Sequence, residues 1–418
     1  MKKKDDNIIT KEVYDLYKKD VEQLSANFNY EINHQKNTIE KLQNELNSVY
    51  SSKAWKLVQK YREFIVSLKP KKDISKTIEN NHIEFVKENK DKPLIAYIIP
   101  GCEMSGGIAV VCQHLNRLKK RGYNVLMITE YIDTKIDWFP NQDVEIVTID
   151  NCPTNIDILV ATSWTTAYTL EKINAKEKYY FVQSDETRFF KSGAKEIELA
   201  RNTYKMNVKF ITEAKWIQKW LKDNFGKDAY YVPNGIDTDF MYPTLDRYNK
   251  DRKKRVLLEG AIDIPYKGME DAFKAVEGLD CEVWCVSSSG QPKSEWKCDK
   301  FFQRVPISGM NFIYSQCDVL LKMSRVEGFF GPPMEMMACK GTCVVGKVSG
   351  YDEYIVDGEN ALVVEQGDVE SAHKALEKLL SDDELREKLS NNGYETALQW
   401  NWEDSIDKLE NIFSKGEE

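Results

Sequence analysis

Long apolar runs are absent from this sequence of 418 residues. The longest stretches, such as Leu94–Pro100, fall far short of the roughly 20 residues that a helix needs to span a bilayer. No apolar signal core follows the lysine-rich opening. An excess of basic residues is also lacking, because 59 of them stand against 67 acidic residues and the net charge is −8. We therefore expect a cytoplasmic protein that binds no nucleic acid and in which any phosphate site is local.

Potential metal ligands are scarce as well. The sequence has four histidines and nine cysteines, an odd number. The pairs Cys281/Cys285 and Cys339/Cys343 lie in runs typical of buried strands and have no histidine nearby, so buried thiols are the favoured interpretation. We expect reduced cysteines, no metal site, and histidines, His114 among them, at solvated or helix-capping positions.

Residues 11–69 differ from the rest of the chain, because they lack glycine and carry apolar residues three and four positions apart from Val21 to Val49. This spacing predicts an amphipathic helix able to form a coiled coil. Residues 1–90 hold 18 basic and 14 acidic side chains, whereas the remainder holds 41 and 53. We expect residues 1–91 to be an assembly segment and linker that pairs with a second copy or a partner protein. Contact with the inner face of the cell membrane and a solvated helix that only oligomerises are the alternatives.

From Lys92 onward, short β-branched runs alternate with helical patterns. Six such runs lie between Leu94 and Thr212, and six more lie between Arg255 and Val364, which predicts two parallel, doubly wound α/β sheets. Ligands of such sheets bind at the carboxyl ends of the strands. Turn and linker chemistry near residue 245 separates the two series. We expect Rossmann-like domains at residues 92–245 and 246–395, and a final helix at residues 396–418 that returns to the first domain.

The most informative segment runs from Glu327 to Glu335 and reads Glu-Gly-Phe-Phe-Gly-Pro-Pro-Met-Glu. Pro333 suits the first turn of a helix, so the amides near Phe330 and Gly331 would point toward a phosphate or a sugar oxygen. Glu335, in that first turn, would accept two ribose hydroxyls, and Glu327 would face the sugar beyond the phosphates. The alternative is that Glu335 caps its helix and Glu327 is solvated.

This motif resembles glycosyltransferase family 4, in which two glutamates are separated by seven residues with Gly-Phe and Pro-Pro between them. The likeness extends over roughly residues 93–415. It implies the GT-B fold, two Rossmann-like domains facing a cleft, with a nucleoside diphosphate-sugar as donor. It also implies retention at the anomeric carbon. No metal is expected, because an ammonium and helix-end amides would supply the positive field.

Other segments look like further parts of the same family. Val232–Asp237 is similar to the signature at the passage between the two domains, and Gly106 with Gly107 resembles a glycine-rich turn that approaches the donor. Lys267 lies where the family places a cation beside the diphosphate, which would stabilise charge on the leaving group. The donor-binding residues that the resemblance implies are Gly106, Gly107, Lys267, Arg325, Glu327, Gly328, Phe329, Phe330, Gly331 and Glu335.

Two departures from the family pattern concern charge and acid–base groups. Ala261 occupies the place of an arginine that many members pair with the lysine, and Arg325 or Arg304 would have to replace it. No histidine is available near the reacting sugar. The string Phe181-Val-Gln-Ser-Asp-Glu186 is instead similar to bacterial cell-surface transferases that include rhamnosyltransferases. The acceptor-side candidates are Trp164, Gln183, Asp185 and Glu186, with Asp185 placed to contact or deprotonate an acceptor hydroxyl.

Together with the resemblance, which alone implies retention, the sequence predicts a glycosyltransferase that moves a hexose or deoxyhexose to a hydroxyl of a bacterial surface glycan or glycoconjugate. Glu327, Lys267 and Asp185 are its expected catalytic residues. One alternative is a catalytically weak relative that acts as an assembly or chaperone subunit. Another is a nucleotide-sugar epimerase of the same architecture. The donor base, the sugar, the linkage and the acceptor stay open.

Overall fold

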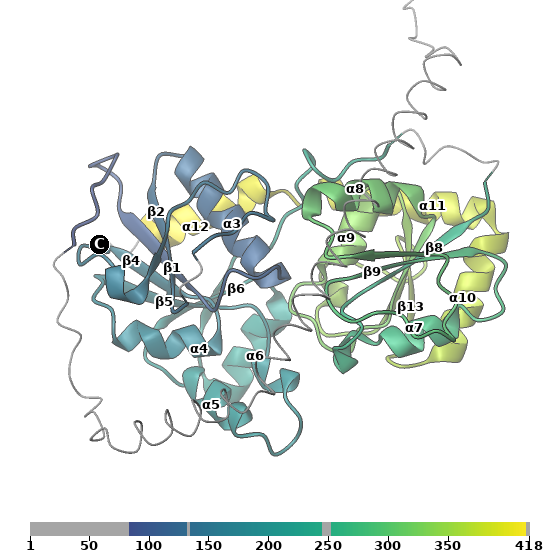
Figure 1. Cartoon of the computed structure of the whole chain (residues 1–418), viewed down its shortest axis with the longest axis horizontal. Coiled ribbons are helices and arrows are strands. Elements are labelled where there is room, and N and C mark those ends of the chain that lie inside the picture. The colour runs from purple at the N-terminus through teal and green to yellow at the C-terminus, as the bar shows by residue number, and fades with distance from the viewer. Residues whose placement is uncertain (1–82, 132–133, 245–251, 415–418) are drawn as a thin grey trace, which may run out of the picture. The chain divides into compact units, whose positions relative to one another are not determined.

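The structure, a computed structural model, describes residues 83–131, 134–244 and 252–414 (Figure 1). These residues belong to one compact unit that spans residues 78–418. The coiled coil predicted for residues 11–69 lies outside the described residues.

The first sheet has seven parallel strands in the order β3-β2-β1-β4-β5-β6-β7. All six predicted runs form strands. The seventh, β7, has three residues at the sheet edge and was not predicted. The bounds are β1 Leu94–Ile99, β2 Asn124–Thr129, β3 Ile146–Thr148, β4 Ile158–Ala161, β5 Glu177–Val182, β6 Lys209–Thr212 and β7 Ala229–Tyr231.

Helices cover both faces of this sheet, which explains why β1 is apolar and buried at every position. The odd-numbered side chains of β1 share a core with α3 and α12, whereas the even-numbered ones share a core with α4 and α6. The final helix α12 packs on α3, and Figure 1 shows the two side by side. The bounds are α3 Gly106–Lys120, α4 Trp164–Ala167, α5 Lys195–Thr203, α6 Lys215–Phe225 and α12 Trp402–Ser414.

The second sheet has six parallel strands in the order β10-β9-β8-β11-β12-β13. Its six predicted runs all form strands, although β10 ends before Arg304, which has a positive φ of 53°. The strands are β8 Arg255–Glu259, β9 Glu282–Ser287, β10 Lys300–Gln303, β11 Val319–Lys322, β12 Thr342–Gly346 and β13 Leu362–Val364. The helices are α7 Met269–Ala275, α8 Ile307–Gln316, α9 Gly331–Ala338, α10 Val369–Ser381 and α11 Asp383–Leu398.

The strand order reverses between β1 and β4 in the first sheet and between β8 and β11 in the second. Such a switch point opens a crevice at the carboxyl ends of the strands, and ligands of open α/β sheets bind there. The predicted fold class, two doubly wound parallel sheets, is confirmed. Within the described part of the chain, no helix combines the length and the apolar character needed to cross a membrane.

Two predictions about side-chain environment have different outcomes. The thiols of Cys281, Cys285, Cys339 and Cys343 are buried, as predicted. The prediction for His114 is wrong, because its side chain is completely buried in the core between α3 and α12, with its ring 5.8 Å from that of Trp402. Burial lowers the pKa of His114 to about 3.

Candidate functional site

The carboxyl ends of β8 and β11, at the switch point of the second sheet, carry a buried ion pair. Lys322, the last residue of β11, is only 2% exposed. Its Nζ donates to the backbone carbonyl of Glu259 at 3.0 Å and also bonds the carboxylate of Glu259, the last residue of β8. These bonds therefore hold the ammonium of Lys322 at the carboxyl ends of β8 and β11.

Glu327 lies between this lysine and a second one. The Nζ of Lys267 donates to both carboxylate oxygens of Glu327, at 3.0 and 2.9 Å, and the Nζ of Lys322 is 3.9 Å from Oε1. Burial alone would raise the pKa of Glu327, but the charges of Lys267 and Lys322 outweigh that effect and hold the pKa below its usual value. The structure thus brings together two predicted residues, Lys267 and Glu327, and keeps the carboxylate ionised.

A glycine turn sets the position of Lys267. Lys267 ends a short 3-10 turn, and Gly268 follows with a φ of 66°. A Cβ on Gly268 would lie 2.0 Å from the carbonyl oxygen of Met323, just beyond β11. Only glycine lets the turn approach β11 this closely, and this approach brings the ammonium to Glu327.

Glu335 lies one turn later in its helix than predicted. The helix α9 begins at Gly331, because two prolines suit its first turn, where no backbone N–H is needed. The Glu335 side chain accepts a hydrogen bond from the hydroxyl of Tyr314 at 2.8 Å. Burial raises the pKa of Glu335 to about 7, although the bond from Tyr314 opposes the shift. This carboxyl therefore titrates near neutral pH.

Two other groups that were predicted to bind the sugar donor are already hydrogen-bonded to residues of the chain. The amide of Gly331, expected to be open to a phosphate, donates to the carbonyl of Phe329 at 3.0 Å. The guanidinium of Arg325, expected to compensate for Ala261, is paired with Asp271 at the start of α7. In this arrangement Arg325 does not replace the missing cation at the glutamate. Phe330 is completely buried.

The acceptor-side candidates follow β5 in the first sheet. Glu186 accepts hydrogen bonds from the backbone N of Trp164 at 2.7 Å and from the hydroxyl of Tyr180 at 2.9 Å. Burial raises the pKa of Glu186 to about 7. Asp185 caps the next turn by accepting from the backbone N of Thr187 at 3.1 Å. Glu186 therefore anchors Trp164 in this structure, and Asp185 is half-buried at the rim.

Gln183 lies close to Gly107 in the glycine turn at the start of α3. The amide of Gln183 donates to the carbonyl of Thr162 at 3.2 Å. A Cβ on Gly107, in the first turn of α3, would lie 3.1 Å from the Gln183 side chain, whereas a Cβ on Gly106 would meet nothing within 4 Å. Of these two glycines, only Gly107 is closely approached by another side chain.

Several residues that connect the two sheets were missed from the sequence. Glu213, directly after β6, accepts a hydrogen bond from the backbone N of Phe329 at 3.0 Å, and the indole of Trp216 donates to the carbonyl of Gly328 at 2.8 Å. Arg188 donates to the carbonyl of Arg325 at 2.9 Å. The position of Glu213 at the carboxyl end of a predicted strand was the one available signal.

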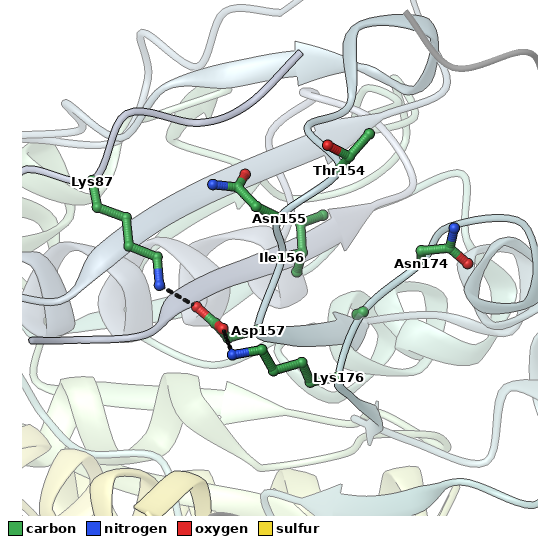
Figure 2. A pocket seen from close by; sticks show the side chains of 8 residues that line it. Lys87, Thr154, Asn155, Ile156, Asp157, Asn174 and Lys176 are labelled. Atoms are coloured by element: carbon green, nitrogen blue, oxygen red, sulfur yellow. Dashed lines mark hydrogen bonds and ion pairs between the residues drawn. The ribbon is translucent and has the colours of Figure 1, made fainter. Parts of the chain in front are cut away.

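A cavity of about 390 Å³ lies at the amino ends of strands β4 and β5 in the first sheet (Figure 2). Asp157, just before β4, accepts from Lys87 at 2.6 Å, from Lys176 at 2.7 Å and from the backbone N of Leu94 at 2.7 Å. Burial would raise the pKa of Asp157, but Lys176 and Lys87 hold it below the usual value. These groups secure the amino ends of the strands, away from the carboxyl-end site.

Among the described residues, no group of three or more histidine, cysteine, aspartate and glutamate side chains is arranged to hold a metal ion.

Comparison with known proteins gives one family match and a set of distant relatives. Residues 299–396 match the family model described as "Glycosyl transferases group 1". The chain is 25% identical over 218 residues to an uncharacterized glycosyltransferase of Methanocaldococcus jannaschii, covering 50% of this chain and 59% of the relative. It is 25% identical over 262 residues to an O-antigen biosynthesis protein of Myxococcus xanthus, covering 60% of this chain and 20% of the relative. The chain thus covers less than two thirds of each relative.

Solved structures share the fold. A sucrose-phosphate synthase from Thermosynechococcus elongatus superposes with a TM-score of 0.66 at 15% identity, covering 78% of this chain and 99% of that one. The Anabaena protein HepE, in complex with UDP-glucose, superposes with a TM-score of 0.65 at 13% identity, covering 77% and 100%.

Proposed function

We propose that this chain is a GT-B glycosyltransferase that transfers a sugar from a nucleoside diphosphate-sugar, because residues 299–396 match the group 1 glycosyl transferase model and the fold is shared with solved structures of that class. The proposed acceptor is a hydroxyl of a bacterial surface glycan or glycoconjugate. The observation that carries the proposal is Glu327, held ionised between Lys267 and Lys322 at the switch point of the second sheet.

Lys267 and Glu327 would bind different parts of the sugar donor. An ammonium has three N–H donors, so Lys267 can keep one bond to Glu327 and turn the others toward the diphosphate. There it would stabilise the negative charge that develops on the leaving oxygen. The carboxylate of Glu327 would accept the hydroxyls of the transferred sugar, and Glu335 would accept the ribose hydroxyls.

The acceptor would lie against the first sheet. Asp185, half-buried after β5, is the proposed contact or base for the acceptor hydroxyl, and Gln183 lies beside it. Trp164 offers an aromatic surface next to Phe190, with the two ring centroids 6.1 Å apart. Glu186 accepts hydrogen bonds from Tyr180 and from the backbone of Trp164, and it would act by keeping the Trp164 ring in position.

The named relatives support the class of substrates. Matching proteins include ones named for O-antigen and capsular polysaccharide biosynthesis, and the HepE structure contains UDP-glucose. We propose retention at the anomeric carbon and no metal requirement. We also propose that residues 11–69 bind a second copy of the chain or a partner protein, with contact to the membrane surface as the alternative.

A panel of uridine, guanosine, thymidine and adenosine diphospho-sugars, screened by thermal shift, tests the proposal. A bound donor raises the melting temperature by mass action, and the responding compound then enters a transfer assay with NMR detection of the anomeric configuration. If no nucleoside diphosphate-sugar stabilises the protein and none is turned over, the proposal fails. An inverted anomeric product would overturn retention alone.

One observation favours a second candidate, a donor-binding assembly subunit without turnover. Arg325 is paired with Asp271 and Ala261 replaces the expected arginine, so the described site has fewer free cations than the family pattern implies. Donor binding without transfer or hydrolysis, across the panel and several acceptors, would establish this candidate.

A further inference from the structure

The Gly328–Phe329 peptide lies in the loop between β11 and α9. Both of its polar atoms are hydrogen-bonded by side chains of residues that follow β6 of the first sheet. The carbonyl of Gly328 accepts from the indole of Trp216 at 2.8 Å, and the N–H of Phe329, in the same peptide, donates to Oε1 of Glu213 at 3.0 Å. A carbonyl and an N–H of one trans peptide point in opposite directions. The Gly328–Phe329 peptide therefore cannot rotate without losing at least one of these bonds.

Close packing fixes the same peptide. A Cβ on Gly328 would lie 1.8 Å from the carbonyl oxygen of Gln183 and 2.8 Å from Oε1 of Glu213. The glycine thus lets the loop press directly against the ends of β5 and β6. Because only the Glu327–Gly328 peptide lies between this peptide and the Cα of Glu327, fixing it restricts the backbone at Glu327 and with it the direction of the Glu327 side chain.

Glu213 is suited to this role because its carboxyl is buried and aligned. Its side chain belongs to a residue only 5% exposed, and its second oxygen accepts from Nδ2 of Asn234 at 2.9 Å. Neither donor is a cation. Burial, together with repulsion from the ionised Glu327, raises the pKa of Glu213 to about 7, and the bonds from Asn234 and Phe329 oppose that shift. Such a buried carboxyl is costly, and core packing alone does not require one here.

We propose that Glu213 is a positioning residue, which orients Glu327 through the Gly328–Phe329 peptide and so sets donor affinity and turnover without touching the substrate. This inference rests on the proposed function. It assigns to the first sheet a direct part in shaping the donor site of the second.

The test compares Glu213→Ala with Glu213→Gln. Alanine leaves the buried N–H of Phe329 without its acceptor, and we expect kcat/KM to fall about 5- to 150-fold. Glutamine keeps an acceptor oxygen for Phe329. Its NH2 group replaces the oxygen that accepts from Nδ2 of Asn234, so the Asn234 side-chain amide must turn over and present Oδ1, which has no partner among the described residues, as the acceptor. We therefore expect Glu213→Gln to restore kcat/KM to within about threefold of wild type.

Trp216→Phe provides a matched control, because it removes the bond at the other end of the same peptide and leaves Glu213 intact. We expect it to lower kcat/KM in the same direction. Full activity of Glu213→Ala, or a Glu213→Gln variant as weak as Glu213→Ala at equal melting temperature, would overturn the proposal.

Hydrogen exchange separates this inference from the proposed function, since it needs no donor. A peptic fragment that covers the Phe329 amide should exchange faster in Glu213→Ala than in wild type and at the wild-type rate in Glu213→Gln. Equal exchange in all three proteins would overturn the positioning role even if donor transfer is observed. Altered exchange in a protein that binds no nucleotide would leave the loop contact standing and refute the proposed function instead.

Discussion

Replacing Lys267 by methionine removes the ammonium that bridges both oxygens of Glu327, at 3.0 and 2.9 Å, and keeps an apolar side chain of similar length. Within the part of the chain that the structure describes, the other ammonium within 4.0 Å of Glu327 is that of Lys322, at 3.9 Å. Lys322 is itself bonded to Glu259. The variant therefore leaves the carboxylate of Glu327 with one nearby ammonium, which is more distant and shared with Glu259.

The expected loss of stability depends on how far the Lys267–Glu327 pair is buried. Breaking a fully buried pair costs about 3–5 kcal/mol, and an exposed pair is worth about 0.2–1 kcal/mol. The side chains of Lys267 and Glu327 are 25% and 10% exposed, so the pair falls between these limits. We expect Lys267→Met to lower the free energy of unfolding by about 1–3 kcal/mol. Turnover should fall about 100- to 1,000-fold if the ammonium stabilises the leaving group.

Steady-state kinetics at saturating donor, with chemical denaturation in parallel, measures both effects. Lys267→Arg is the control, because it keeps the positive charge and should retain more turnover than Lys267→Met. A kcat for Lys267→Met within about threefold of wild type would refute the assignment of charge stabilisation to this residue.

Other predictions concern donor affinity, pH and metals. Glu335→Ala should raise the donor dissociation constant about 10- to 150-fold in calorimetry, the loss of one charged hydrogen-bonding group. Wild-type affinity should rise between about pH 6 and 8, because burial raises the pKa of Glu335 to about 7 and hydroxyl donors favour its ionised form, and Glu335→Gln should flatten this dependence. Chelation with EDTA should leave transfer unchanged, and restoration by magnesium or manganese would contradict that. The lowered pKa of His114, about 3, means that the stability it contributes above about pH 6.5 is lost as the pH falls toward 3, so His114→Phe should weaken the acid dependence of the melting temperature.

Much of the fold could be predicted from local patterns. The run Leu94–Ile99 is apolar at every position, which is typical of a parallel strand covered on both faces, and it forms β1 within those bounds. Boundaries were less predictable where backbone geometry decides them. Arg304 ends β10 through its positive φ, and the start of α9 at Gly331 moves Glu335 into the second turn of that helix.

Contacts within the candidate site could be predicted where family-like motifs carry the residues, and they could not be predicted where the two sheets meet. Glu327 and Lys267 come from motif positions 60 residues apart, and the structure joins them. The hydrogen bonds that Phe329 donates to Glu213 and that Arg188 donates to Arg325 link residues 116 and 137 positions apart, which follow strands of different sheets. Local periodicity reports the element to which a residue belongs and contains no information about which loop of the other sheet it meets. His114 was misjudged for the same reason, because α12, which covers it, comes at the end of the chain.

The most direct test is a crystal structure of the protein with the nucleoside diphosphate-sugar that the thermal screen selects. The account predicts the diphosphate beside the Lys267 ammonium, sugar hydroxyls on Glu327 and ribose hydroxyls on Glu335. A donor bound away from the ends of β8 and β11, with both glutamates free of it, would contradict the account.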